Sequence, residues 1–105
     1  MKKAMYLLVA FAVIFLVGAV AYSADAAHGK QVFAAEKCQM CHSIAGVGGK
    51  MAKLDGVGAK LTANEIKKWI KTPKAMKADA KMKPYPNISD KDLEDLTAYL
   101  LTLKK

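Results

Sequence analysis

The stretch Cys38-Gln39-Met40-Cys41-His42 constrains this chain more than any other feature, because it places both of its cysteines in one C-x-x-C-H pattern. This spacing is the attachment signature of a c-type haem. Two thiols three residues apart can bond the two vinyl groups of one porphyrin, and the imidazole that follows can ligate its iron. On a helical turn these three side chains share one face. The motif therefore predicts a fold built around one covalently attached haem.

Two other chemistries also use paired cysteines. A thiol–disulfide redox centre of the C-x-x-C kind is expected in a βαβ context, and the sequence shows none. A zinc site needs a second pair of ligands at a suitable spacing. The only other histidine, His28, precedes Cys38 by ten residues on an expected helix, which separates the two by roughly 15 Å. Thiol–disulfide exchange stays as an alternative, and haem attachment accounts for more of the pattern.

The beginning of the chain has the composition of an export signal. Two lysines are followed by an uncharged run over residues 4–22 and then by small residues. We expect residues 1–24 to be a signal peptide cut near Ala24, and residues 25–105 to form one haem-carrying domain. An uncleaved membrane anchor is the alternative, since the run nearly spans a bilayer. Either way the domain is exported, so we expect a periplasmic protein that meets a membrane only if this segment is retained.

The charge is strongly positive. All 17 basic residues are lysines, against nine acidic residues, and loss of Lys2 and Lys3 lowers the formal net charge from +8 to +6. Nucleic acid suits such a charge, but export and the lack of arginine argue against it. Lysine is a hydrated point charge that suits transient encounters. We therefore expect redox protein partners with acidic docking surfaces and no nucleic acid, although solubility alone would also explain the lysines.

Three helices are expected after the signal. The first runs from about residue 26 to residue 40. The second begins at the capping box Thr62-Ala63-Asn64-Glu65 and ends near Pro73. The third begins at Ser89, a serine N-cap followed by leucines at helical spacing. The glycine-rich stretch 43–61 is expected to be a loop, and no strand pattern is visible, so the fold class is all-α.

Six motifs together resemble the small class I monohaem c-type cytochromes, and they follow the family's order along the chain. They are Gly29-x-x-x-Phe33, Cys38-Gln39-Met40-Cys41-His42, Leu54-Asp55-Gly56-Val57-Gly58, Trp69-Ile70-x-x-Pro73, Met82-Lys83-Pro84-Tyr85-Pro86 and Leu96-Thr97-Ala98-Tyr99-Leu100. The resemblance implies a cytochrome c-like fold of three main helices with long loops around one haem. It also implies a one-electron carrier between redox partners, and not an enzyme.

The resemblance assigns roles to individual residues. Cys38 and Cys41 would carry haem c, His42 would be the proximal iron ligand and Met82 the distal one. Trp69 would lie near a haem propionate, to which its indole N–H could donate a hydrogen bond.

By the same likeness, Gly29 and Phe33 would cross the last helix near Leu96 and Tyr99. The chain departs from the family where a Gly-Pro pair usually precedes the residue equivalent to Leu54. That proline's carbonyl usually accepts a hydrogen bond from the proximal imidazole, and here the carbonyl of Ala52 could take its place in a less rigid loop.

The sixth ligand can also be approached from the methionines themselves. Position in the chain argues against four of the six: Met1, Met5, Met40 and Met51. Met82 precedes two prolines, whose fixed φ stiffens the loop that must hold sulfur on iron, and Met76 stays as the alternative. With both axial positions filled, substrate chemistry is not expected. A haem gas sensor or a peroxidase-like protein would instead need an open sixth position.

Overall fold

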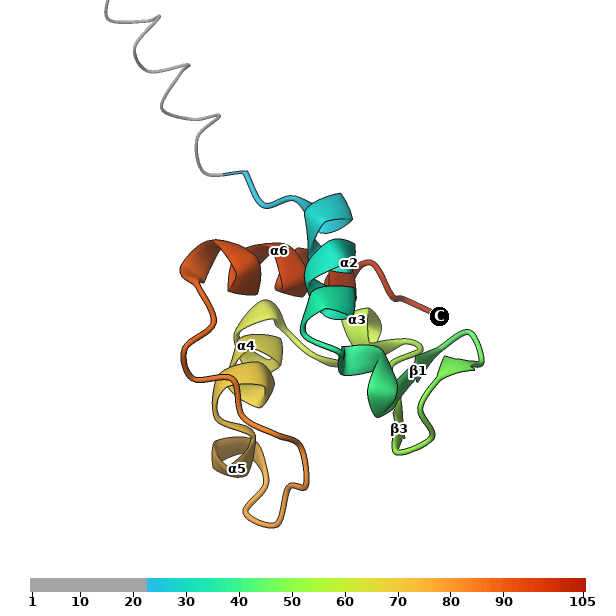
Figure 1. The fold of residues 1–105 in the computed structure, drawn as a ribbon, viewed down its shortest axis with the longest axis vertical. Helices are drawn as coiled ribbons and strands as arrows, with labels where there is room; N and C mark the ends of the chain where they lie inside the picture. Colours follow the sequence, from blue (N-terminus) through green and yellow to red (C-terminus); the bar gives the residue numbers. More distant parts are fainter. Residues whose placement is uncertain (1–22) are drawn as a thin grey trace, which may run out of the picture.

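The computed structural model describes residues 23–105 (Figure 1), so most of the expected signal segment, residues 1–22, lies outside the described residues. The elements follow in this order: α2 (Ala26–Ala35), η1 (Cys38–Met40), β1 (His42–Ile44), β2 (Val47–Gly48), β3 (Ala52–Lys53), α3 (Val57–Lys60), α4 (Ala63–Lys71), α5 (Pro73–Met76) and α6 (Asp90–Leu101). Within this part of the chain, no helix is long and apolar enough to cross a membrane.

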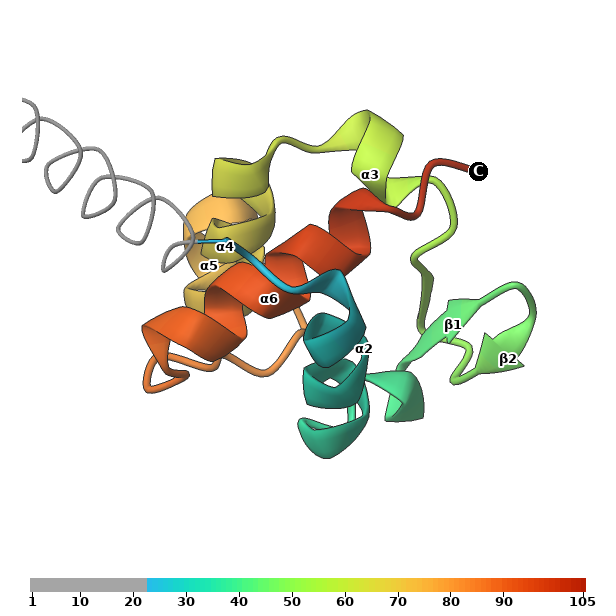
Figure 2. The ribbon, with the colours of Figure 1, turned by 90° about the horizontal axis from the view of Figure 1, so that it is seen from above.

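The centre of the fold is the crossing of α2 and α6, which Figure 2 shows from above. Gly29 permits this crossing, because a Cβ atom there would lie 1.9 Å from the carbonyl oxygen of Asp95. One turn later Phe33 meets Tyr99 edge to face, with ring centroids 5.9 Å apart. The close approach that the sequence predicts for Gly29 is confirmed, and it occurs at Asp95 and Tyr99.

A small apolar core lies between three helices. Its buried side chains come from α2, α4 and α6: Val32, Phe33, Ile66, Ile70, Leu93, Leu96 and Leu100. These residues recur at helical spacing on α4 and α6, so that one face of each helix is removed from water. The described core is therefore built by the same three main helices that the sequence predicts.

The N-termini of two of these helices are fixed by the predicted caps. Glu65 N donates to the Thr62 hydroxyl at 3.2 Å, while the Glu65 carboxylate accepts from Thr62 N at 2.9 Å. The hydrogen bond from the Thr62 backbone N–H to the carboxylate is the main cause that lowers the pKa of Glu65. Ser89 accepts from Asp92 N at 3.1 Å and so caps α6. Pro73 does more than terminate α4, because it also opens the short helix α5.

The described residues are largely helical, as expected, but they are not all-α. The stretch predicted to be a loop, 43–61, contains α3 and most of a three-stranded sheet in the order β2-β1-β3. Strands of two or three residues are too short to show an alternating pattern. The turn between β1 and β2 is made by Ala45 and Gly46, whose φ angles of 53° and 80° are both left-handed, as a two-residue hairpin requires.

The first helix is also shorter than expected. It ends at Ala35, and Lys37 has the left-handed φ of 60° that turns the chain into η1. The attachment motif therefore begins after α2 has ended, on the separate 3₁₀ turn η1.

Candidate functional site

Cys38 opens the 3₁₀ turn η1, and Cys41 is its C-cap residue. Cys41 N donates to the carbonyl of Cys38 at 3.2 Å. In a 3₁₀ helix, residues three apart lie one above the other, so the two thiols are on the same side of the turn. Both thiols are free; Cys38 is half-buried against the core, and Cys41 is exposed. The pair can therefore be attached to one flat group that lies along this turn.

The histidine of the motif is held by the small sheet. His42 opens β1 and pairs in parallel register with Ala52 of β3, and its Nδ1 lies 3.2 Å from the carbonyl oxygen of Ala52. A carbonyl can only accept, so Nδ1 carries the proton and the lone pair of Nε2 is available to a metal. The carbonyl that the sequence names as a possible acceptor does take this role, and two thiols with an oriented imidazole fit a covalently bound haem.

The environment of Cys38 argues against thiol–disulfide chemistry. Burial raises the pKa of the Cys38 thiol to about 11, and the nearby carboxylate of Glu36 adds to this effect. The attacking species in disulfide exchange is a thiolate, which reactive cysteines stabilise with a lowered pKa. Cys38 is therefore poorly suited to start such an exchange, whereas thioether formation would remove the titrating proton altogether.

A zinc site has no support among the described residues either. Within residues 23–105, no group of three or more histidine, cysteine and acidic side chains could hold a metal ion. His28, the other candidate ligand, instead directs its Nδ1 toward Asp95.

The residues that the sequence predicts for the distal side of the haem lie on α4, on α5 and in the segment of residues 77–88. This segment leads from α5 to α6 and is orange in Figure 1. Met82 is half-buried and packs against the apolar core. Met76, at the end of α5, and Trp69, on α4, are also half-buried. Iron ligation by Met82 and a propionate contact of Trp69 stay predictions at this point.

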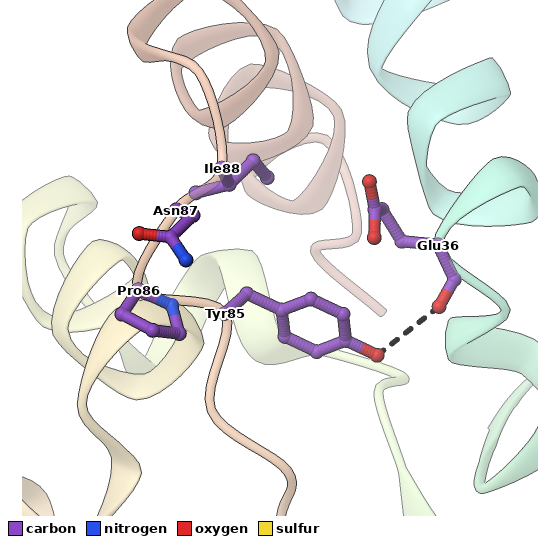
Figure 3. Close-up of a pocket in the computed structure, with 5 residues that line it drawn as sticks. All are labelled: Glu36, Tyr85, Pro86, Asn87 and Ile88. Atoms are coloured by element: carbon purple, nitrogen blue, oxygen red, sulfur yellow. Dashed lines mark hydrogen bonds between the residues drawn. The ribbon is translucent and has the colours of Figure 1, made fainter.

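Tyr85 is a functional candidate that the sequence analysis did not single out. Its hydroxyl donates to the carbonyl of Glu36 at 3.1 Å (Figure 3), and its backbone N–H donates to the carbonyl of Ile70 at 2.9 Å. Burial raises the pKa of the phenol, so the hydroxyl stays protonated and able to donate at neutral pH. The position of Tyr85 between two prolines, three residues after Met82, was the available sequence signal.

Asp95 is a second residue that sequence reasoning missed. It is 1 % exposed and accepts hydrogen bonds from Asp25 N at 2.8 Å, His28 Nδ1 at 2.7 Å and Lys91 Nζ at 3.0 Å. The bond from the Asp25 N–H, followed by that from Lys91, lowers the pKa of Asp95 to about 2. A buried carboxylate is tolerated in a protein when it is saturated with donors in this way.

Comparison with known proteins shows which proteins this chain is similar to. The family model described as cytochrome c matches residues 26–104, which include the attachment motif and all the described helices. The cytochrome c oxidase subunit 2 of Alkalihalophilus pseudofirmus is 32% identical over an alignment of 85 residues, which covers 72% of this chain. This chain spans only 25% of the length of that relative.

Proposed function

This chain belongs to the cytochrome c family, and we propose that it is an exported one-electron carrier whose haem iron is held between His42 and Met82. The family carries covalently bound haem c, and the haem supplies an iron that alternates between the ferrous and ferric states. The single observation that carries the assignment is the contact of His42 Nδ1 with the carbonyl of Ala52, which orients the imidazole directly after the two free thiols of Cys38 and Cys41.

The proximal side is the better supported half of the site. The hydrogen bond from His42 Nδ1 to Ala52 O fixes both the tautomer and the ring orientation, which metal-bound histidines generally require. Two covalent bonds at Cys38 and Cys41 would prevent dissociation of the group during repeated electron transfer. The parallel pairing of β1 with β3 brings Ala52 next to His42. The small sheet therefore positions the acceptor that orients the imidazole.

On the distal side we propose Met82 as the sixth ligand and Trp69 as a contact of a propionate. A thioether is soft and stays uncharged, and Met/His ligation raises the reduction potential of haem iron. Packing of Met82 against the core supports this choice over Met76. A filled sixth position leaves no open site for a substrate, so the proposal is a carrier without enzyme activity and not a gas sensor or a peroxidase-like protein.

Redox proteins are the partners of this family, and we propose that those of this chain present acidic surfaces. The hairpin lobe, residues 37–54, contains three lysines and no acidic residue. It also carries three strongly exposed apolar side chains, Met40 at 70%, Val47 at 77% and Met51 at 69%. The haem is attached within this lobe, so a partner with an apolar centre and an acidic rim would come close to the haem there.

We also propose a periplasmic location, with the signal cut near Ala24. The support is the uncharged run of residues 4–22 behind two lysines. Retention of this segment as an anchor would leave the haem domain on the same side of the membrane. The name of the relative from Alkalihalophilus pseudofirmus suggests a cytochrome c oxidase as one class of partner.

Two methionine substitutions test the ligand assignment. In protein matured with its haem, Met82→Ala should abolish the weak near-infrared charge-transfer band of the oxidised form and lower the reduction potential. Met76→Ala is the matched control and should leave both unchanged. The reverse result would make Met76 the ligand, and the absence of the band from the unmodified protein would indicate an open sixth position.

A further inference from the structure

Tyr85 alone provides the hydrogen bonds that tie the Met82 loop, defined here as residues 78–88, to other elements within residues 23–105. The remaining backbone bonds of this loop are local, from Ala80 N to Lys77 O and from Ile88 N to Tyr85 O. Met82 itself is held by apolar packing, which is not directional. The direction of the loop therefore depends on the two bonds of Tyr85.

Both bonds of Tyr85 end on carbonyl groups at the C-termini of helices. Ile70 lies in the last turn of α4, and Glu36 is the C-cap of α2. Carbonyls at these positions have no partner within their own helix. Tyr85 supplies a donor to each of them, its backbone N–H to α4 and its hydroxyl to α2. Loss of the hydroxyl would leave the Glu36 carbonyl without its donor.

Glu36 lies two residues before Cys38, the first cysteine of the attachment motif. Figure 3 shows the phenol of Tyr85 reaching from the Met82 loop to the end of α2. The hollow at this place has a volume of about 240 Å³ and is lined by Glu36, Tyr85, Pro86, Asn87 and Ile88. One side chain thus joins the loop of the proposed distal ligand to the segment that carries the attachment cysteines.

We infer that Tyr85 is a positioning residue that holds the Met82 loop closed over the haem. This inference rests on the proposed function, because it takes Met82 as the sixth ligand. Tyr85 touches neither iron nor electron-transfer partner in this role. It acts by limiting how far the loop moves away from the attachment segment, and so by limiting how often the sulfur leaves the metal.

Imidazole binding to the oxidised haem protein tests this role directly, because imidazole can occupy the sixth position only when Met82 has left it. Tyr85→Phe removes the bond to Glu36 O and keeps the ring and the backbone bond to Ile70. A typical net contribution of one hydrogen bond corresponds to a roughly two- to tenfold higher affinity for imidazole. The midpoint of global unfolding, measured in denaturant without imidazole, separates loop opening from general destabilisation.

Two control variants fit the geometry. Tyr99→Phe removes the hydroxyl of another half-buried tyrosine, whose ring packs on Phe33, and should leave imidazole affinity unchanged. Glu36→Gln should also leave it unchanged, because the acceptor is the backbone carbonyl and not the carboxylate. An affinity that rises equally in Tyr85→Phe and Tyr99→Phe, or that does not rise in Tyr85→Phe, would overturn the inference.

Met82→Ala separates this inference from the ligand assignment on which it rests. If Met82→Ala loses the near-infrared band while Tyr85→Phe binds imidazole like the unmodified protein, Met82 is the ligand and Tyr85 does not position it. If the band survives Met82→Ala, the ligand assignment fails and the role of Tyr85 fails with it.

Discussion

The ring Nδ1 of His28 lies 2.7 Å from a carboxylate oxygen of Asp95, and this contact joins the first turn of α2 to the middle of α6. The other carboxylate oxygen accepts from the backbone N–H of Asp25 at 2.8 Å. A buried charge, on a residue that is 1% exposed, thus lies at the crossing of the two helices, where α6 also accommodates Gly29. Removal of one partner from such a buried, bonded charge is generally costly.

Acid should weaken the fold through Asp95. Its pKa is lowered from 3.8 to about 2, first by the Asp25 N–H and then by Lys91. A carboxyl group with a depressed pKa stabilises the folded state above the ordinary value, and this contribution is lost as the pH falls from about 3.8 to about 2. Asp95→Asn should lower the melting temperature at pH 7 by roughly 5 °C or more. Below pH 4, the melting temperature of this variant should fall less steeply with pH than that of the unmodified protein.

Circular dichroism melts of the haem-loaded protein between pH 7 and pH 2 measure this dependence. Asp79→Asn is the control, because the Asp79 side chain is 80% exposed and its distance to Lys77 Nζ is 3.9 Å. That variant should follow the unmodified protein at every pH. An Asp95→Asn protein with the same acid slope as the unmodified chain would show that Asp95 does not control acid stability.

Gly29→Ala should destabilise the protein, although alanine is the better helix former. In an exposed helix interior this substitution gains up to about 1 kcal/mol. Here the added Cβ would lie 1.9 Å from a backbone carbonyl oxygen of Asp95, which cannot rotate away as a side chain would. We expect a net loss of about 1–3 kcal/mol in the free energy of unfolding, measured by denaturant titration. A gain in stability would mean that α2 and α6 are not in close contact.

Thr62→Ala should remove half of the capping box of α4. The Thr62 hydroxyl accepts from Glu65 N at 3.2 Å, and loss of such a cap costs about 1 kcal/mol. Thr72→Ala is a matched control, since the hydroxyl of Thr72 donates to the Lys68 carbonyl and does not cap α5. Equal losses of stability from the two changes would show that the capping box contributes nothing specific.

The caps could be predicted because they are local chemistry. Thr62 and Glu65 are three residues apart, and Ser89 directly precedes the acidic first turn of α6. The short strands could not be predicted, because two or three residues carry no period. The left-handed conformation of Lys37 has no sequence signal of the kind that glycine gives, so the break between α2 and η1 was also missed.

The candidate site also has parts that the sequence predicts and parts that it does not. The thiols and the imidazole of the attachment motif were visible as a spacing, and Ala52 as an acceptor followed from the resemblance. The bond between Tyr85 and Glu36 spans 49 residues of sequence, and the bond between Asp25 and Asp95 spans 70. Such contacts depend on how the helices pack, and no single segment of the sequence contains both partners.

The lysines near the site should influence how fast the chain associates with a redox partner. Lys81 and Lys83 are exposed on either side of Met82, and Lys37 directly precedes the first cysteine. Positive charges around the point of electron transfer should steer an acidic partner and raise the association rate more than the affinity. The exposed Met40 in the hairpin lobe should instead contribute apolar contact, which salt does not screen.

Stopped-flow measurement of electron transfer to an acidic redox protein distinguishes these contributions. The Debye length falls from about 30 Å at 0.01 M salt to about 10 Å at 0.1 M, so the second-order rate should fall steeply over this range. Lys81→Glu should flatten the salt dependence. Lys83→Glu should do the same, but Lys83 Nζ also lies 5.6 Å from the Tyr85 ring, so Lys81 gives the cleaner test.

Two further variants complete the test. Lys104→Glu should change the salt dependence less, because Lys104 belongs neither to the attachment segment nor to the Met82 loop and directs its Nζ to Gly58 O. Met40→Ser should lower the rate at every salt concentration without changing the slope, because it removes apolar contact and no charge. A rate that is indifferent to salt, or equal effects of Lys81→Glu and Lys104→Glu, would mean that the lysines serve solubility and do not steer a partner.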